Sequence, residues 1–119
     1  MATLSANTFK NRLAAETHYL AAIDSAAADA RRLDPAQAEV YREKLAQAKA
    51  GGGQLLDAEA DALGTDADTV RNAVLRNHNV RQQHVNAVEL QRIKAKADVR
   101  SATTAAAMHR IFNEFKGAL

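Results

Sequence analysis

The stretch VNAVELQRIKAKADV, residues 85–99, decides the fold. Steps of three and four residues join one series in which a single cation stands among apolar residues: Val85, Val88, Arg92, Ala95, Val99. A second apolar series lies on another face: Leu90, Ile93, Ala97. Such spacing places each series along one side of an α-helix. We therefore predict a long helix over residues 81–102 that is sandwiched between neighbouring helices or shared between subunits.

The segments at the two ends of the chain carry the other apolar series. In the last helix, which Thr103 or Thr104 is predicted to cap, this series is the densest of the chain: Met108, Ile111, Phe112, Phe115, Leu119. A first helix is expected over residues 5–32, with this stripe: Phe9, Leu13, Leu20, Ile23, Ala27, Ala30. Its steps of three and four, broken by Glu16, are typical of a coiled-coil seam.

The middle of the chain is divided by helix start and stop signals. Asp34 followed by Pro35 predicts a helix start. The helix would run to Ala50, and four of its residues would face the core: Val40, Tyr41, Leu45, Ala48. Three glycines, residues 51–53, predict a flexible joint.

A short helix over residues 54–63 is expected to stop at Gly64. Thr65 is predicted to cap the next helix, which carries Val70 and Val74. Residues 77–79 (Asn-His-Asn) are poor helix formers, so we expect a kink or break there.

Together these signals predict an all-α protein. We expect an extended bundle of about five to six helices with coiled-coil-like seams, because no segment alternates apolar and polar residues with a period of two. The predicted parts are an N-terminal helical hairpin (residues 1–50), the glycine joint (51–53) and a C-terminal helical region (54–119), forming one folding unit.

Composition predicts a thin core. Alanine supplies 28 of the 119 residues; it favours helices but buries little apolar area. The net charge is only +2, so the chain is not of the highly charged, disordered type. A thin core is commonly completed by association, so we expect a homo-oligomer.

No constellation of catalytic or metal-binding residues is visible. The four histidines, His18, His78, His84 and His109, lack the spacing of a helical metal site, and there is no cysteine. The acidic run Asp57, Glu59, Asp61 distributes carboxylates around a helix, which is typical of a solvated face. We therefore expect no metal, no cofactor and no enzymatic activity.

Residues 71–100 are rich in arginine and lysine, and the sequence pI is near 9.2. Arg81, Arg92 and Lys96 share a helix face and are candidate contacts for an anionic partner. Nucleic-acid binding is therefore an alternative, although no aromatic residues accompany the cations to stack bases. We expect neither a secretory signal nor a membrane span.

Two stretches carry a family resemblance. YREKLAQAKAGGGQLLDAEADALGTDADTVRNAVL (residues 41–75) resembles a short region of many tail proteins of tailed phages and prophages. VELQRIKAKADVRSATTAAAMHRIFNEF (residues 88–115) is similar to the terminal part of the same proteins. The resemblance covers residues 41–119 and implies a small helical protein of the tail-fibre or baseplate region, with no catalytic residues to carry over.

What the resemblance implies is a structural or accessory virion component, assembled in the host bacterial cytoplasm. Its partners would be tail, tail-fibre or baseplate proteins. The alternatives are a tail-fibre assembly chaperone and a small basic nucleic-acid-binding regulator. Ten apolar residues are the predicted partner or oligomer interface: Phe9, Leu13, Leu20, Ile23, Val85, Val88, Val99, Ile111, Phe112, Phe115.

Overall fold

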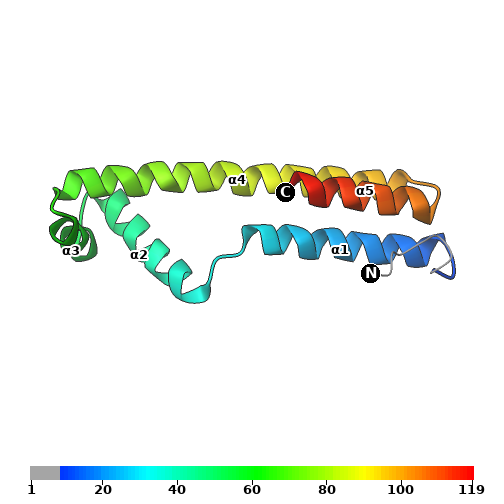
Figure 1. The fold of residues 1–119 in the computed structure, drawn as a ribbon, viewed down its shortest axis with the longest axis horizontal. Helices are drawn as coiled ribbons and strands as arrows, with labels where there is room; N and C mark the ends of the chain where they lie inside the picture. Colours follow the sequence, from blue (N-terminus) through cyan, green and yellow to red (C-terminus); the bar gives the residue numbers. More distant parts are fainter. Residues whose placement is uncertain (1–8) are drawn as a thin grey trace. The chain divides into compact units, whose positions relative to one another are not determined.

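The computed structural model describes residues 9–119, and these residues form five helices with no strand. The helices are α1 (Arg12–Arg31), α2 (Pro35–Ala50), α3 (Gln54–Leu63), α4 (Ala67–Ser101) and α5 (Ala105–Ala118). Figure 1 shows their order along the chain. The predicted all-helical class is confirmed.

The helices belong to two compact units. Unit 1 contains residues 9–32 and 85–119, and unit 2 contains residues 33–84. Residues 85–101 of α4 belong to unit 1, and residues 67–84 belong to unit 2. This grouping differs from the hairpin over residues 1–50 that the sequence suggested, because α1 packs with the end of the chain and not with α2.

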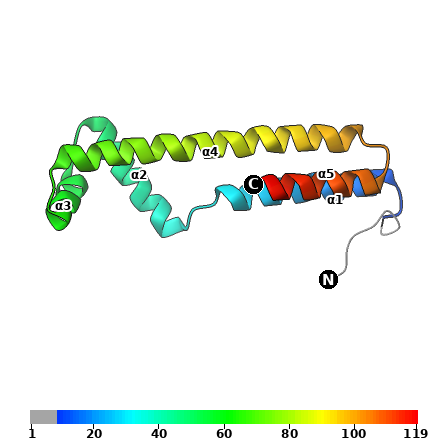
Figure 2. The same ribbon diagram turned by 45° about the horizontal axis from the view of Figure 1, so that its top comes forward.

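Unit 1 is a three-helix arrangement of α1, α5 and residues 85–101 of α4 (Figures 1 and 2). Its core is formed by nine buried residues: Ala15, Tyr19, Ile23, Ala27, Val88, Ala95, Val99, Met108, Phe115. Four of the nine come from α1 at successive steps of four residues. The apolar series of α1, α4 and α5 thus cover one another within the chain, as expected for amphipathic helices that face a common core.

Side chains close the ends of the unit 1 helices. The Asn11 side chain accepts a hydrogen bond from the Ala14 amide, and Thr104 accepts one from the Ala107 amide, which confirms the predicted threonine cap. The Arg12 guanidinium donates to the carbonyl oxygens of Arg100 and Ala102 at 2.7 and 2.8 Å. Arg12 therefore joins the start of α1 to otherwise unpaired carbonyls at the end of α4. The predicted start of the first helix, near Ser5, lies outside the described residues.

Unit 2 is built from α2, α3 and residues 67–84 of α4, around five buried residues: Ala48, Leu56, Ala60, Val70, Val74. Asp34 caps α2 by accepting from the Gln37 amide, and Pro35 occupies the first helical position, as predicted. Gly51 and Gly64 end α2 and α3 in the left-handed conformation, with φ of 97° and 70°. Both stops follow from the freedom of glycine at positive φ.

The glycine joint is spanned by a side chain. The Gln47 Oε1 accepts hydrogen bonds from the amides of Leu55 and Leu56 at 2.9 and 3.2 Å. Gln47 thus caps α3 from the preceding helix, since Gly53, at the N-cap, has no side chain to do so. These two bonds connect the helices on either side of the glycine joint.

Two predictions about α4 are wrong. Its start is capped by Asp66, whose Oδ1 accepts from the Thr69 amide at 2.7 Å, and not by Thr65. The helix also continues without a break through residues 77–79. His78 accounts for part of this continuity: its ring nitrogen is hydrogen-bonded to the Tyr41 hydroxyl of α2, so tertiary contact outweighs the low helix propensity.

Candidate functional site

The residues predicted to form a partner interface lie mostly in the unit 1 core. Ile23, Val88, Val99 and Phe115 are buried. Four others are half-buried and pack against that core: Phe9, Leu20, Ile111, Phe112. Val85 is half-buried as well, whereas Leu13 is 66% exposed.

This placement corrects the sequence interpretation. The apolar rows were treated as surfaces that need another protein, but within one chain they are covered by each other. The reason is that α1 and α5 fold along the same part of α4, so three amphipathic stripes meet. Any docking surface must be sought among the apolar residues that remain exposed.

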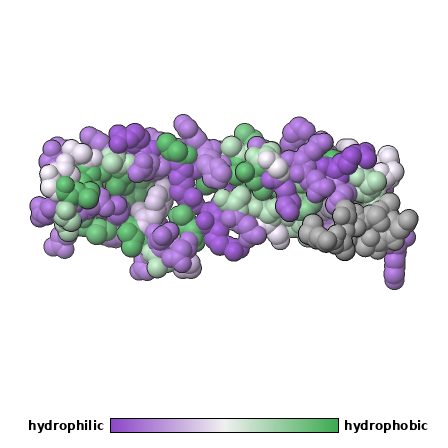
Figure 3. Space-filling view, viewed as in Figure 1, coloured by the Kyte–Doolittle hydropathy of each residue, from purple (hydrophilic) through white to green (hydrophobic). Residues whose placement is uncertain are grey.

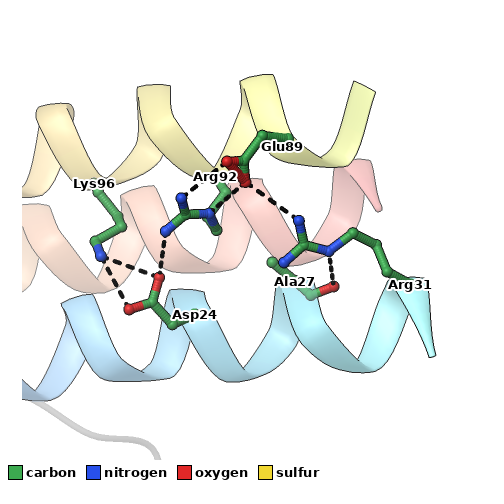
Figure 4. Close-up of polar contacts among 6 residues, drawn as sticks. All are labelled: Asp24, Ala27, Arg31, Glu89, Arg92 and Lys96. Carbon is green, nitrogen blue, oxygen red and sulfur yellow. Dashed lines mark hydrogen bonds and ion pairs between the residues drawn. The ribbon is translucent and has the colours of Figure 1, made fainter. Parts of the chain in front are cut away.

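Arg92 interrupts the apolar seam of α4, and the structure supplies its partners (Figure 4). Its Nε and a terminal nitrogen donate to the two carboxylate oxygens of Glu89 at 2.6 and 2.9 Å. The other terminal nitrogen donates to Asp24 of α1 at 2.8 Å. Arg92 is therefore held in a bidentate pair and a second ion pair at the edge of the core.

Lys96 and Arg31 extend this cluster in unit 1. The Lys96 ammonium contacts both Asp24 oxygens, at 2.9 and 3.1 Å. Arg31 donates to Glu89 and to the carbonyl of Ala27, both at 3.2 Å. Figure 4 shows that the cations alternate with the two carboxylates between α1 and α4.

Ionisation follows from this geometry. The Lys96 hydrogen bond, and after it Arg92, lowers the pKa of Asp24 below its usual 3.8. Arg92 likewise lowers the pKa of Glu89, and the two carboxylates raise the pKa of Arg92. Asp24, Glu89 and Arg92 are therefore held in their charged forms at neutral pH.

The three candidate contacts for an anionic partner do not form one patch in a single unit. Arg92 and Lys96 belong to unit 1, where Asp24 and Glu89 partly neutralise them. Arg81 belongs to unit 2, where its guanidinium lies 6.0 Å from the centre of the Tyr41 ring. The acidic partners went unnoticed in the sequence, although a cation on an apolar seam is itself a signal that a carboxylate lies opposite.

Each unit also contains one tyrosine–histidine hydrogen bond. In unit 1 the buried Tyr19 hydroxyl is 3.0 Å from His109 Nδ1, and burial raises the pKa of Tyr19 above 10.0. In unit 2 Tyr41 is bonded to His78. Two of the four histidines, His78 and His109, thus form hydrogen bonds with buried or half-buried phenols.

An apolar groove of about 420 Å³ lies between α2 and α4 in unit 2 and is here named the α2–α4 groove. Its lining is Ala36, Gln37, Val40, Tyr41, Lys44, Val74 and Asn77. Val40 is 51% exposed within it. Figure 3 shows hydrophobic surface over the α2 and α3 part of this unit. Of the α2 residues predicted to face the core, Ala48 is buried, Tyr41 and Leu45 are half-buried, and Val40 is exposed, because α2 meets α3 and α4 mainly through its C-terminal end.

The second exposed feature lies on α4 in unit 1. Leu90 and Ile93 are 69% and 52% exposed, and Ala97 is exposed beside them. These residues, here named the α4 stripe, face away from the buried row of Val88, Ala95 and Val99 on the same helix. The sequence spacing separated these two faces of the helix correctly. The structure adds that only the face with Val88, Ala95 and Val99 is covered within the chain.

Residues 9–119 contain no group of three or more histidine or acidic side chains placed to hold a metal ion. Over the same residues, none of the helices has the length and apolar character needed to cross a bilayer. Comparisons with protein-family models, curated proteins and solved structures found no match.

Proposed function

We propose that this protein is a structural or accessory component of a tailed-phage virion that docks on other proteins through helix faces. The observation that supports the docking role is the presence of two exposed apolar surfaces, the α4 stripe and the α2–α4 groove. Large aliphatic side chains that are more than half exposed on ordered helices favour burial against another protein.

The virion setting is supported by the resemblance of residues 41–75 and 88–115 to phage tail proteins. In the proposal the partners are tail, tail-fibre or baseplate proteins. Small helical modules with an apolar face or groove dock by burying that face, with no need for catalytic groups.

The nucleic-acid alternative is less well supported. Arg92 and Lys96 already bind Asp24 and Glu89, so phosphate contacts would have to displace these internal partners. In that alternative the affinity for duplex DNA would fall steeply with salt, because counterions are released on binding.

The test is mass spectrometry of washed phage particles from the bacterium that carries the gene. We expect the protein at a fixed copy number relative to the major tail proteins. A protein found on assembly intermediates but lost from mature particles would replace the virion role with that of an assembly chaperone. Absence from both would overturn the proposal.

A further inference from the structure

Helix α4 contains a long interior stretch in which no side chain is buried. Val74 is the last buried residue of this helix in unit 2, and Val88 is its first buried residue in unit 1. The thirteen residues between them, 75–87, are all half-buried or exposed, and Val80 is 62% exposed. They make roughly three and a half helical turns. Over these turns α4 lacks the packed apolar face from which most protein helices gain their stability.

The same stretch is rich in residues that favour a helix only weakly. Asparagine, histidine and β-branched valine supply seven of the eleven residues from 77 to 87. Residues 89–97, ELQRIKAKA, consist almost entirely of strong helix formers. Low helix propensity and the lack of core packing therefore coincide in one interior part of α4.

Two contacts with α2 support the beginning of this stretch. His78 is hydrogen-bonded to Tyr41, and the Arg81 guanidinium lies 6.0 Å from the centre of the same ring. All three residues belong to unit 2 and are half-buried. Water competes for polar contacts of this kind, so they stabilise the helix less than a buried apolar face would.

The boundary between the two compact units falls in the same stretch, between His84 and Val85. The chain passes between the units at one other place, the connection from α1 to α2, and residues 32–34 there are not helical. The weakly supported part of α4 is therefore the only helical connection between two separately packed cores of the described residues.

We propose that residues 76–87 of α4 are a hinge, which opens by local loss of helical hydrogen bonds while the cores of both units stay folded. The open form is a minor state, because interrupting a helix carries a nucleation factor of about 10⁻³. Such an opening lets each unit meet a docking partner in its own orientation. The inference goes beyond the proposed function and does not depend on which partners the protein has.

The experiment is native-state hydrogen exchange of the full chain, followed by mass spectrometry of peptides along α4. Amides within residues 76–87 should be protected about 10³-fold relative to an unstructured chain. Amides within residues 71–75 and 89–101 should be protected at least about tenfold more, because they exchange only when a packed core opens. The hinge thus predicts a minimum of protection in the interior of the helix, whereas fraying would lower protection at its ends.

Substitutions on the exposed side of the stretch test its cause. Asn77→Ala/Asn79→Ala touches neither core and should slow exchange within residues 76–87 about fivefold, because alanine favours a helix more than asparagine does. Gln83→Gly should speed exchange there about threefold, since glycine disfavours a helix. Neither variant should change the protection of residues 89–101.

The matched control is Asn72→Ala, an exposed asparagine of the same helix that lies between the buried Val70 and Val74. It lies outside the proposed hinge, so exchange within residues 76–87 should stay as in the wild type. Circular dichroism of each variant checks that the helices are retained, which is expected because all the substituted residues are exposed.

Three outcomes would overturn the inference. Equal protection along residues 71–101 would mean that α4 opens only when both cores unfold. Exchange within residues 76–87 that is unchanged in the double variant, or slowed as much by Asn72→Ala, would mean that the opening lies elsewhere. None of these outcomes bears on the proposed function, which is decided separately by the presence of the protein in particles.

Discussion

At the scale of single residues, Arg92 shows how a polar group is accommodated on a packed helix face. A cation between Val88 and Ala95 would be costly without partners, and Glu89 and Asp24 supply two carboxylates within 3 Å. Asp24 also binds Lys96, which lies on α4 one turn after Arg92. The pairs lie at the edge of the core and are partly exposed, so solvent screens them.

Asp24→Asn should therefore destabilise the protein at neutral pH by about 1 kcal/mol, the upper range for a partly exposed ion-pair network. The pKa of Asp24 is lower in the folded state than its usual 3.8, so its contribution is fully present above that pH and is lost as the pH falls through the folded value. Urea unfolding of wild type and variant should give a constant difference from pH 5 to 7 that shrinks below about pH 4.

The matched control is Asp29→Asn, because Asp29 is an α1 carboxylate whose ion pair with Arg32 is 65% exposed on the aspartate side. It should leave the free energy of unfolding almost unchanged. Equal effects of the two substitutions would show that the Asp24 cluster adds nothing beyond an ordinary surface charge.

At the scale of secondary-structure elements, the limits of α2 and α3 follow directly from the sequence. Asp34-Pro35, Gly51 and Gly64 start or end these helices as predicted, because caps and positive-φ glycines act locally. The predicted break at residues 77–79 does not occur, because a contact distant in the sequence outweighs the local signal there. Local propensity favours a break, but the contact of His78 with Tyr41 on another helix decides the outcome, and sequence spacing alone does not reveal it.

The Gln47 cap gives a prediction at this scale. A Cβ added at Gly53 would lie 2.4 Å from the Cδ of Gln47, so Gly53→Ala must displace the side chain that caps α3. Gln47→Ala alone should cost about 1 kcal/mol through the lost cap. Because both changes remove the same hydrogen bonds, the double variant should be less destabilised than the sum of the two by about 1 kcal/mol.

Chemical denaturation of the four proteins of this double-mutant cycle measures the coupling. Gly117→Ala is the control partner, since nothing lies within 4 Å of a Cβ added there. Its effect should add to that of Gln47→Ala. Additivity at Gly53 as well would mean that Gln47 does not occupy the space beside the glycine joint.

At the scale of the whole molecule, the class of fold was predictable and the grouping of helices was not. The apolar spacing of each segment indicates a helix with a buried face, but it does not say which helix covers that face. Residues 9–32 and 85–119 come together although 52 residues separate them, and a contact of that kind leaves no local signal. For the same reason the groove and the stripe emerged only when the covered faces were known.

The two cores share no buried residue, so damage to one should remain local. Val70→Ala, in the unit 2 core, should destabilise by about 2 kcal/mol and speed amide hydrogen exchange in peptides from α2 and α3, with little effect on α1 and α5. Val99→Ala is the counterpart in unit 1 and should give the reverse pattern. Uniform acceleration throughout the chain in both variants would show that it unfolds as a single cooperative block.

The tyrosine–histidine pairs have a practical consequence. The chain has two tyrosines and no tryptophan, and one tyrosine lies in each unit. Tyrosine fluorescence therefore comes from one residue in each unit. Replacing either tyrosine with phenylalanine removes the tyrosine signal of that unit and leaves that of the other. The unfolding of each unit can thus be followed separately through the fluorescence of its own tyrosine.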